Sequence, residues 1–186
     1  MRLVAHVALV ASLAFALPAT AAGKFHLKSA DVKAGGTLTD QQVFSGFGCS
    51  GANVSPQLAW ENAPAGAKSF VVTVYDPDAP TGSGWWHWVV YNLPAATMEL
   101  AQGAGSGKAP LPEGTAQGRT DFGAPGFGGA CPPVGDKPHR YIFTVFALKV
   151  EKLEVPADAS PALIGYMTRA NSLGSATFTA HYGRKK

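Results

Sequence analysis

Two apolar runs on either side of a short proline- and glycine-rich loop constrain the fold of this chain more than any other feature of its sequence. The runs, Phe70–Tyr75 and Trp86–Tyr91, are rich in β-branched and aromatic residues. Apolar runs of this length between turn-forming residues are typical of buried strands rather than helices. The loop between them carries Asp76 and Asp78 and ends beside His87. Because loops between rigid strands often hold binding sites, these three residues are the first functional candidates.

Alternation along the two runs predicts which side chains share a face. Asp76 should share a face with Val74, and His87 should share a face with Val89 and Tyr91. Both faces of the first strand are apolar until its last residue, which predicts a strand inside a two-layer sandwich. Asp76 should then emerge where the sandwich opens, with His87 at the same end if the strands are antiparallel neighbours.

Shorter patterns predict a mostly β chain with one helix near its C-terminus. We expect further strands near 25–32, 58–60, 141–149 and 175–182. Ser160 followed by Pro161 is a helix start, with serine as the N-cap and proline at the first helical position, and the helix should run to about Ser172. Its apolar stripe should pack on the core and comprise Leu163, Tyr166, Met167 and Ala170.

The N-terminus has the pattern of a cleaved secretory signal. Arg2 precedes an apolar run from Leu3 to Leu17, and Ala19-Thr20-Ala21 is an A-x-A cleavage site. Pro18 breaks the run, which is shorter than the ~20 residues that a bilayer requires. We therefore expect residues 1–22 to be removed, leaving residues 23–186 as a single exported domain without an integral membrane span.

Charge and cysteine content narrow the function classes further. Only 15% of residues are charged and the formal net charge is +3, with one basic cluster at the very end of the chain, so we expect no nucleic-acid partner. The chain has two cysteines, Cys49 and Cys131. In an exported protein such a pair is more often a disulfide than a metal site, because two thiols supply too few ligands. We expect the two to be bonded and no metal to be bound.

Several motifs occur between residues 76 and 141 of the chain. They are D-P-D-A-P at 76–80, W-x-H-W at 85–88, C-P-P-x-G at 131–135 and H-R-Y at 139–141. In this order and spacing they resemble the phosphatidylethanolamine-binding protein (PEBP) family, in particular its bacterial Raf kinase inhibitor-like branch. The resemblance implies a two-sheet antiparallel β-sandwich with one or two short helices. It also implies a cis peptide bond between Ala79 and Pro80. The signal pattern at the N-terminus leads us to expect a periplasmic or secreted bacterial protein.

The resemblance places a set of polar and backbone groups around one small pocket. Two imidazoles and the backbone N–H groups of a glycine-rich segment can donate to an anion, and a carboxylate can hold one histidine in a chosen tautomer. Asp78 belongs to the same loop, where it can brace the loop rather than touch a ligand. The expected ligand-binding residues are Asp76, Asp78, His87, Gly129, Pro132, His139 and Tyr141.

The expected function is binding of phosphate-type oxyanions, such as a phospholipid head group or a phosphorylated ligand. The alternative is a protease inhibitor or signalling modulator that acts on a protease or kinase-like partner through protein contacts. The chain has no G-x-S-x-G elbow and no H-E-x-x-H motif, so we do not expect an enzyme. No glycine fingerprint or lysine supports a cofactor, and we expect none.

Overall fold

A computed structural model of the chain describes residues 23–186. The predicted signal segment, residues 1–22, lies outside the described residues. Within 23–186, no helix has both the length and the apolar character needed to cross a bilayer.

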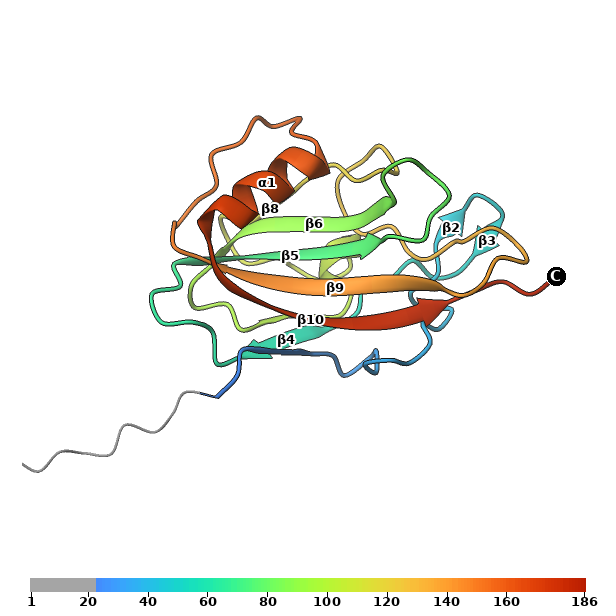
Figure 1. The fold of residues 1–186 in the computed structure, drawn as a ribbon, viewed down its shortest axis with the longest axis horizontal. Helices are drawn as coiled ribbons and strands as arrows, with labels where there is room; N and C mark the ends of the chain where they lie inside the picture. Colours follow the sequence, from blue (N-terminus) through green and yellow to red (C-terminus); the bar gives the residue numbers. More distant parts are fainter. Residues whose placement is uncertain (1–22) are drawn as a thin grey trace, which may run out of the picture.

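Antiparallel sheets form most of the fold. A five-stranded sheet has the order β10-β9-β5-β6-β8 and a three-stranded sheet the order β1-β4-β7, while β2 and β3 form a separate hairpin. Figure 1 shows β5, β6, β9 and β10 side by side, with the β2–β3 hairpin and the C-terminus at the same end of the molecule. The strands are β1 His26–Lys28, β2 Ser45–Gly46, β3 Cys49–Ser50, β4 Leu58–Glu61, β5 Ser69–Asp76, β6 Trp85–Pro94, β7 Glu99–Leu100, β8 Ala116–Gln117, β9 His139–Leu148 and β10 Ser172–Tyr182.

The five-stranded sheet is buried on both faces, as the two apolar runs predicted. One face of β5, with Phe70 and Val72, belongs to the main core, which also contains Trp60 of β4 in the three-stranded sheet. The opposite face, with Val71, packs in a second cluster that contains Ile164 of the helix α1, Pro161–Asn171. The predicted mostly β sandwich is confirmed, with a helix covering the second face of the larger sheet. The only other helix of residues 23–186 is the short 3-10 turn η1, Ala104–Ser106.

A bulge in β6 overturns the predicted alternation of that strand. Val74 pairs with Trp88 and Tyr75 pairs with Trp86, so His87 is an extra residue between two register pairs. Trp86 therefore joins the α1 side of the sheet, whereas the His87 ring lies 5.1 Å from the ring of Tyr141 on the main-core side. The expectation that His87 shares a face with Val89 and Tyr91 is wrong, because a bulge turns the extra side chain to the other face.

Helix α1 begins as predicted but packs through a different stripe. Ser160 is the N-cap, and its Oγ accepts a hydrogen bond from the Leu163 backbone N–H at 3.2 Å. The buried residues of the helix are Pro161, Ile164 and Thr168. Of the predicted packing stripe, Met167 does pack against the second cluster. Leu163 is 40% exposed and Tyr166 is 70% exposed, so that part of the prediction was wrong.

Candidate functional site

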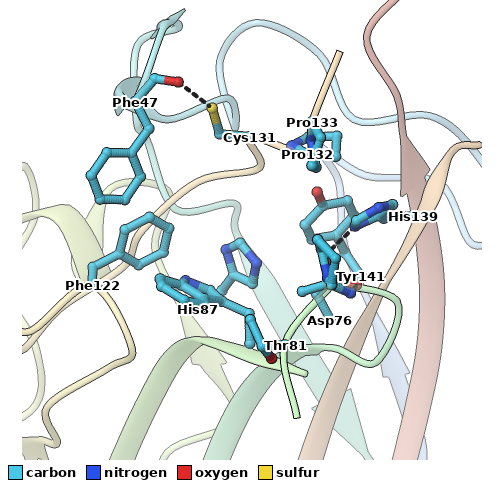
Figure 2. A pocket seen from close by; sticks show the side chains of 13 residues that line it. Phe47, Asp76, Thr81, His87, Phe122, Cys131, Pro132, Pro133, His139 and Tyr141 are labelled. Atoms are coloured by element: carbon cyan, nitrogen blue, oxygen red, sulfur yellow. Dashed lines mark hydrogen bonds and ion pairs between the residues drawn. The ribbon is translucent and has the colours of Figure 1, made fainter. Parts of the chain in front are cut away.

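A cavity of about 210 Å³ opens where β5 ends and β6 and β9 begin. Figure 2 shows an aromatic side with Phe47 and Phe122 facing a polar side with Asp76, His139 and Tyr141, while the His87 ring lies between them. The cavity is thus bounded by segments that lie far apart in the sequence. Its lining residues are Phe47, Asp76, Ala79, Pro80, Thr81, Trp85, His87, Phe122, Cys131, Pro132, Pro133, His139 and Tyr141.

Asp76 ends β5 and organises the loop that follows it. Its side chain is 2% exposed, and Oδ1 accepts hydrogen bonds from the backbone N–H groups of Asp78 at 2.8 Å and Ala79 at 3.2 Å. These hydrogen bonds close the turn that follows β5, and the peptide bonds of the turn are trans. None of residues 23–186 has a cis peptide bond, so the cis bond expected before Pro80 is wrong.

His139 is fixed by carboxylates on two sides. Its Nδ1–H donates to Asp76 Oδ2 at 2.7 Å, which is the carboxylate-held histidine that the resemblance implied. Its Nε2 lies 3.5 Å from Asp136 Oδ2. Because both ring nitrogens face carboxylates, His139 does not present a free N–H to the cavity. This differs from the expectation that both imidazoles would donate to an anion. Its arrangement suits it to hold Asp76 in place.

His87 is buried at 3% exposure and its tautomer is fixed by a backbone carbonyl. Nδ1 lies 2.7 Å from the Gly128 oxygen, and since a carbonyl can only accept, Nδ1 carries the proton. Nε2 is then the nitrogen available to a ligand. Burial lowers the pKa of His87, against a weaker opposing effect of the Gly128 carbonyl and of Asp76. The neutral ring therefore offers an acceptor at Nε2 until the ring is protonated.

Two buried donors that belong to lining residues have no hydrogen-bond partner. Tyr141 is 1% exposed, and its hydroxyl has no partner among residues 23–186. The indole Nε1 of Trp85 is in the same position. Burial raises the pKa of Tyr141, so its hydroxyl keeps its proton and can donate. Buried polar groups are nearly always paired in folded proteins, and an acceptor bound in the cavity would pair with these two donors. Three other buried polar atoms of the described residues are also unpaired but lie outside the cavity lining: Trp60 Nε1, Thr115 Oγ1 and Thr168 Oγ1.

The glycine-rich segment does not supply the donors that were expected. The Gly129 N–H donates to Asn53 Oδ1 at 2.7 Å, and the Gly128 N–H donates to the His87 carbonyl at 2.8 Å. Gly129 does not line the cavity, and its N–H is already paired with Asn53. A Cβ at Gly129 would clash with the Gln42 carbonyl oxygen, so the backbone is closely packed at this glycine.

Asp78 also lies outside the cavity lining and acts as a brace. Its Oδ1 accepts a hydrogen bond from Arg140 Nη2 at 2.7 Å, and its Oδ2 accepts one from Arg140 Nε at 2.8 Å. This bidentate pair lowers the pKa of Asp78 to about 2. Of the two roles expected for Asp78, the geometry supports bracing of the loop. Arg140 and its neighbours His139 and Tyr141 point to opposite sides of β9, because successive side chains of a strand alternate.

The aromatic side of the cavity was missed by the sequence reasoning. Phe47 and Phe122 are near-parallel at 17° with centroids 5.9 Å apart, and Trp85 meets Phe122 edge-on at 5.4 Å. Phe47 lies between two glycines and Phe122 lies in T-D-F-G, so local signals existed for both. Nothing in the local sequence indicated that they meet. Pro132, which was predicted, does line the cavity.

A disulfide and an arginine tie this aromatic side to the polar side. Cys49 and Cys131 are bonded, with an S–S distance of 2.08 Å, which confirms the predicted pair. Arg184 Nε donates to the Pro132 carbonyl at 2.6 Å, and its Nη1 donates to the Gly48 carbonyl at 2.9 Å. The β2–β3 hairpin is thereby held against the loop that carries Pro132.

Comparisons with known proteins agree on one family. The family model described as phosphatidylethanolamine-binding protein matches residues 28–183. The chain is 55% identical over 171 residues to the Escherichia coli (strain K12) protein YbcL, covering 91% of this chain and 93% of YbcL. It is 56% identical to E. coli YbhB, covering 84% of this chain and 98% of YbhB.

Solved structures match in the same way. The crystal structure of E. coli YbcL, titled a new member of the mammalian PEBP family, superposes with a TM-score of 0.83 at 56% identity and covers 87% of this chain and 99% of that one. A PEBP homologue from Chlamydia trachomatis superposes with a TM-score of 0.72 at 29% identity and covers 86% of this chain and 97% of that one. These matches extend over most of the described fold.

Proposed function

Because this chain belongs to the phosphatidylethanolamine-binding protein family, we propose that its cavity binds a small oxyanion of the phosphate type. The oxyanion is either free or part of an ester such as a phospholipid head group. The observation that carries the proposal is the Tyr141 hydroxyl, a buried donor without a partner in a residue that lines the cavity. An oxyanion oxygen would satisfy it, and a hydrogen bond to a charged acceptor contributes about 1.5–3 kcal/mol.

His87 supports the same ligand class. Its Nε2 is the ring nitrogen that Gly128 leaves unused. An oxyanion near Nε2 favours the protonated ring, which then donates a charge-assisted hydrogen bond. Asp76 does not oppose the ligand with a free carboxylate, since it already accepts three hydrogen bonds. Tyr141, and His87 once it is protonated, therefore offer donors to an oxyanion, while the Asp76 carboxylate is already paired.

Two further proposals concern the cellular location of the protein and its lack of catalytic activity. We propose that the protein is exported to the periplasm or secreted, which the Cys49–Cys131 bond supports because disulfides persist in oxidising compartments. We also propose that it binds its ligand without transforming it, needs no metal or cofactor, and does not bind nucleic acid. The alternative of a protease inhibitor or signalling modulator is not favoured by the cavity or by the relatives.

The test is titration calorimetry of residues 23–186 with inorganic phosphate, phosphoethanolamine and glycerophosphoethanolamine. Tyr141→Phe removes only the hydroxyl oxygen, so we expect affinity to fall roughly ten- to a hundredfold. The melting temperature should stay equal or rise, because the variant removes a buried polar group that has no partner. Preference among the three ligands separates a free ion from a lipid head group.

Tyr166→Phe is the matched control, since Tyr166 is 70% exposed on α1 and outside the cavity. It should bind like the wild type. If all three ligands fail to bind, or if Tyr141→Phe binds them as tightly as the wild type, the proposed site is wrong.

A further inference from the structure

Phe47 combines exposure with an unfavourable backbone conformation. Its side chain is 70% exposed, and its φ is +52°, in the left-handed region that bulky residues rarely adopt. Both properties oppose folding stability, because an exposed ring gains little from burial and a left-handed residue with a Cβ is strained. Asparagine and glycine are the usual residues in a two-residue hairpin turn of this kind, so a bulky exposed ring at this position points to a role other than stability.

The surrounding structure holds this ring at the cavity. Phe47 is in the turn between β2 and β3, and the next residues are Gly48, whose carbonyl accepts from Arg184, and Cys49, which is bonded to Cys131. The ring packs 5.5 Å from Phe44 and lines the cavity beside Phe122. In Figure 2 it stands across the cavity from Tyr141. The β2–β3 hairpin is thus anchored at several points, and it holds the Phe47 ring at the edge of the cavity.

The lining lacks the charges that a bare phosphate would require. None of the thirteen lining residues is a lysine or an arginine, and most of them are aromatic, proline or alanine. Transferring an unpaired dianion from water into such a cavity is costly. A ligand that also covers the aromatic side with its own apolar surface would offset that cost.

We propose that the ligand is an organic oxyanion with a planar apolar substituent, such as an aryl phosphate, and that Phe47 is the residue that selects for this substituent. The inference rests on the proposed function and adds the chemistry of the ligand's second half. Its oxyanion lies toward Tyr141 and His87, and its ring covers Phe47 and Phe122.

The experiment compares phenyl phosphate with methyl phosphate, two monoesters that differ in the substituent alone. We expect the wild type to prefer phenyl phosphate by about tenfold, since an aromatic pair adds to plain area burial. Phe47→Ala keeps a Cβ and the same backbone strain but removes the ring. It should lose the preference while keeping its affinity for methyl phosphate, and Phe47→Tyr should restore the preference.

Tyr166→Ala is the matched control, because Tyr166 is also 70% exposed but lies on α1, away from the hairpin. It should leave both affinities unchanged. Equal binding of the two esters by the wild type would overturn the inference and leave the proposed function intact. A Phe47→Ala variant that weakens both esters equally would do the same.

Two further outcomes also count against the inference. Failure of both esters to bind would remove the proposed function and this inference with it. Vesicles of phosphatidylglycerol and phosphatidylcholine provide the last arm. If the Phe47→Ala variant binds these vesicles more weakly than the wild type does and still prefers phenyl phosphate over methyl phosphate, Phe47 is a membrane contact and not a selector of the ligand.

Discussion

The ionisation of His87 should make ligand binding depend on pH. Burial lowers the pKa of the free ring, and Nδ1 already donates to Gly128, so the neutral ring has no proton on Nε2 to offer. An oxyanion that prefers the protonated ring raises its pKa on binding, which means that protons are taken up. Affinity should therefore increase as pH falls from about 8 to 5.5.

This prediction is best measured with sulfate, whose charge is constant over that range. Titration calorimetry in two buffers of different ionisation enthalpy gives the number of protons taken up. His87→Ala should weaken binding roughly ten- to a hundredfold and remove most of the proton uptake. Wild-type affinity that does not change with pH would contradict the assigned role of His87.

At the scale of elements, the bulge in β6 is what makes His87 available to the cavity. With regular alternation from Trp88, the ring would lie on the α1 side, among apolar residues of the second cluster. The extra residue between the Tyr75 and Val74 pairs moves it to the side of Tyr141. This single irregularity in β6 therefore decides whether His87 reaches the cavity.

The orientation of α1 gives a stability prediction at the same scale. Ile164 is 1% exposed on the sheet-facing side, so Ile164→Ala should lower the free energy of unfolding by about 2–5 kcal/mol. Ser160→Ala, which removes the N-cap, should cost about 1 kcal/mol. Leu163→Ala is the matched aliphatic control and should change stability by less than about 0.5 kcal/mol, since Leu163 is 40% exposed.

Urea denaturation followed by circular dichroism measures these differences. A large effect of Leu163→Ala together with a small effect of Ile164→Ala would mean that α1 packs through the stripe that its sequence first suggested.

At the scale of the whole molecule, the Cys49–Cys131 bond joins regions that are 82 residues apart. Closing so long a loop in the unfolded chain should stabilise the fold by about 2–4 kcal/mol. The double variant Cys49→Ser/Cys131→Ser should therefore unfold at lower urea concentration than the wild type under oxidising conditions. Dithiothreitol should lower the stability of the wild type and leave the double variant unchanged. Equal stability of the two proteins without reductant would contradict this prediction.

Much of this fold follows from short-range patterns in the sequence. The strands flanking residues 77–84 and the Ser160 cap were both predicted correctly. Each depends on periodicity or on hydrogen bonds between residues a few positions apart, which the sequence contains directly. The four motifs at 76–80, 85–88, 131–135 and 139–141 likewise indicated the family to which the chain belongs.

The binding properties of the cavity were decided by the tertiary structure. Strand register creates the bulge that aims His87, and close packing against Gln42 and Asn53 consumes the Gly129 N–H. The aromatic side exists because a disulfide and Arg184 bring Phe47 to Phe122. These outcomes depend on partners that are tens of residues away, and the local sequence around each residue is compatible with other arrangements. The sequence thus determined which elements form, whereas long-range register and packing determined which groups a ligand meets.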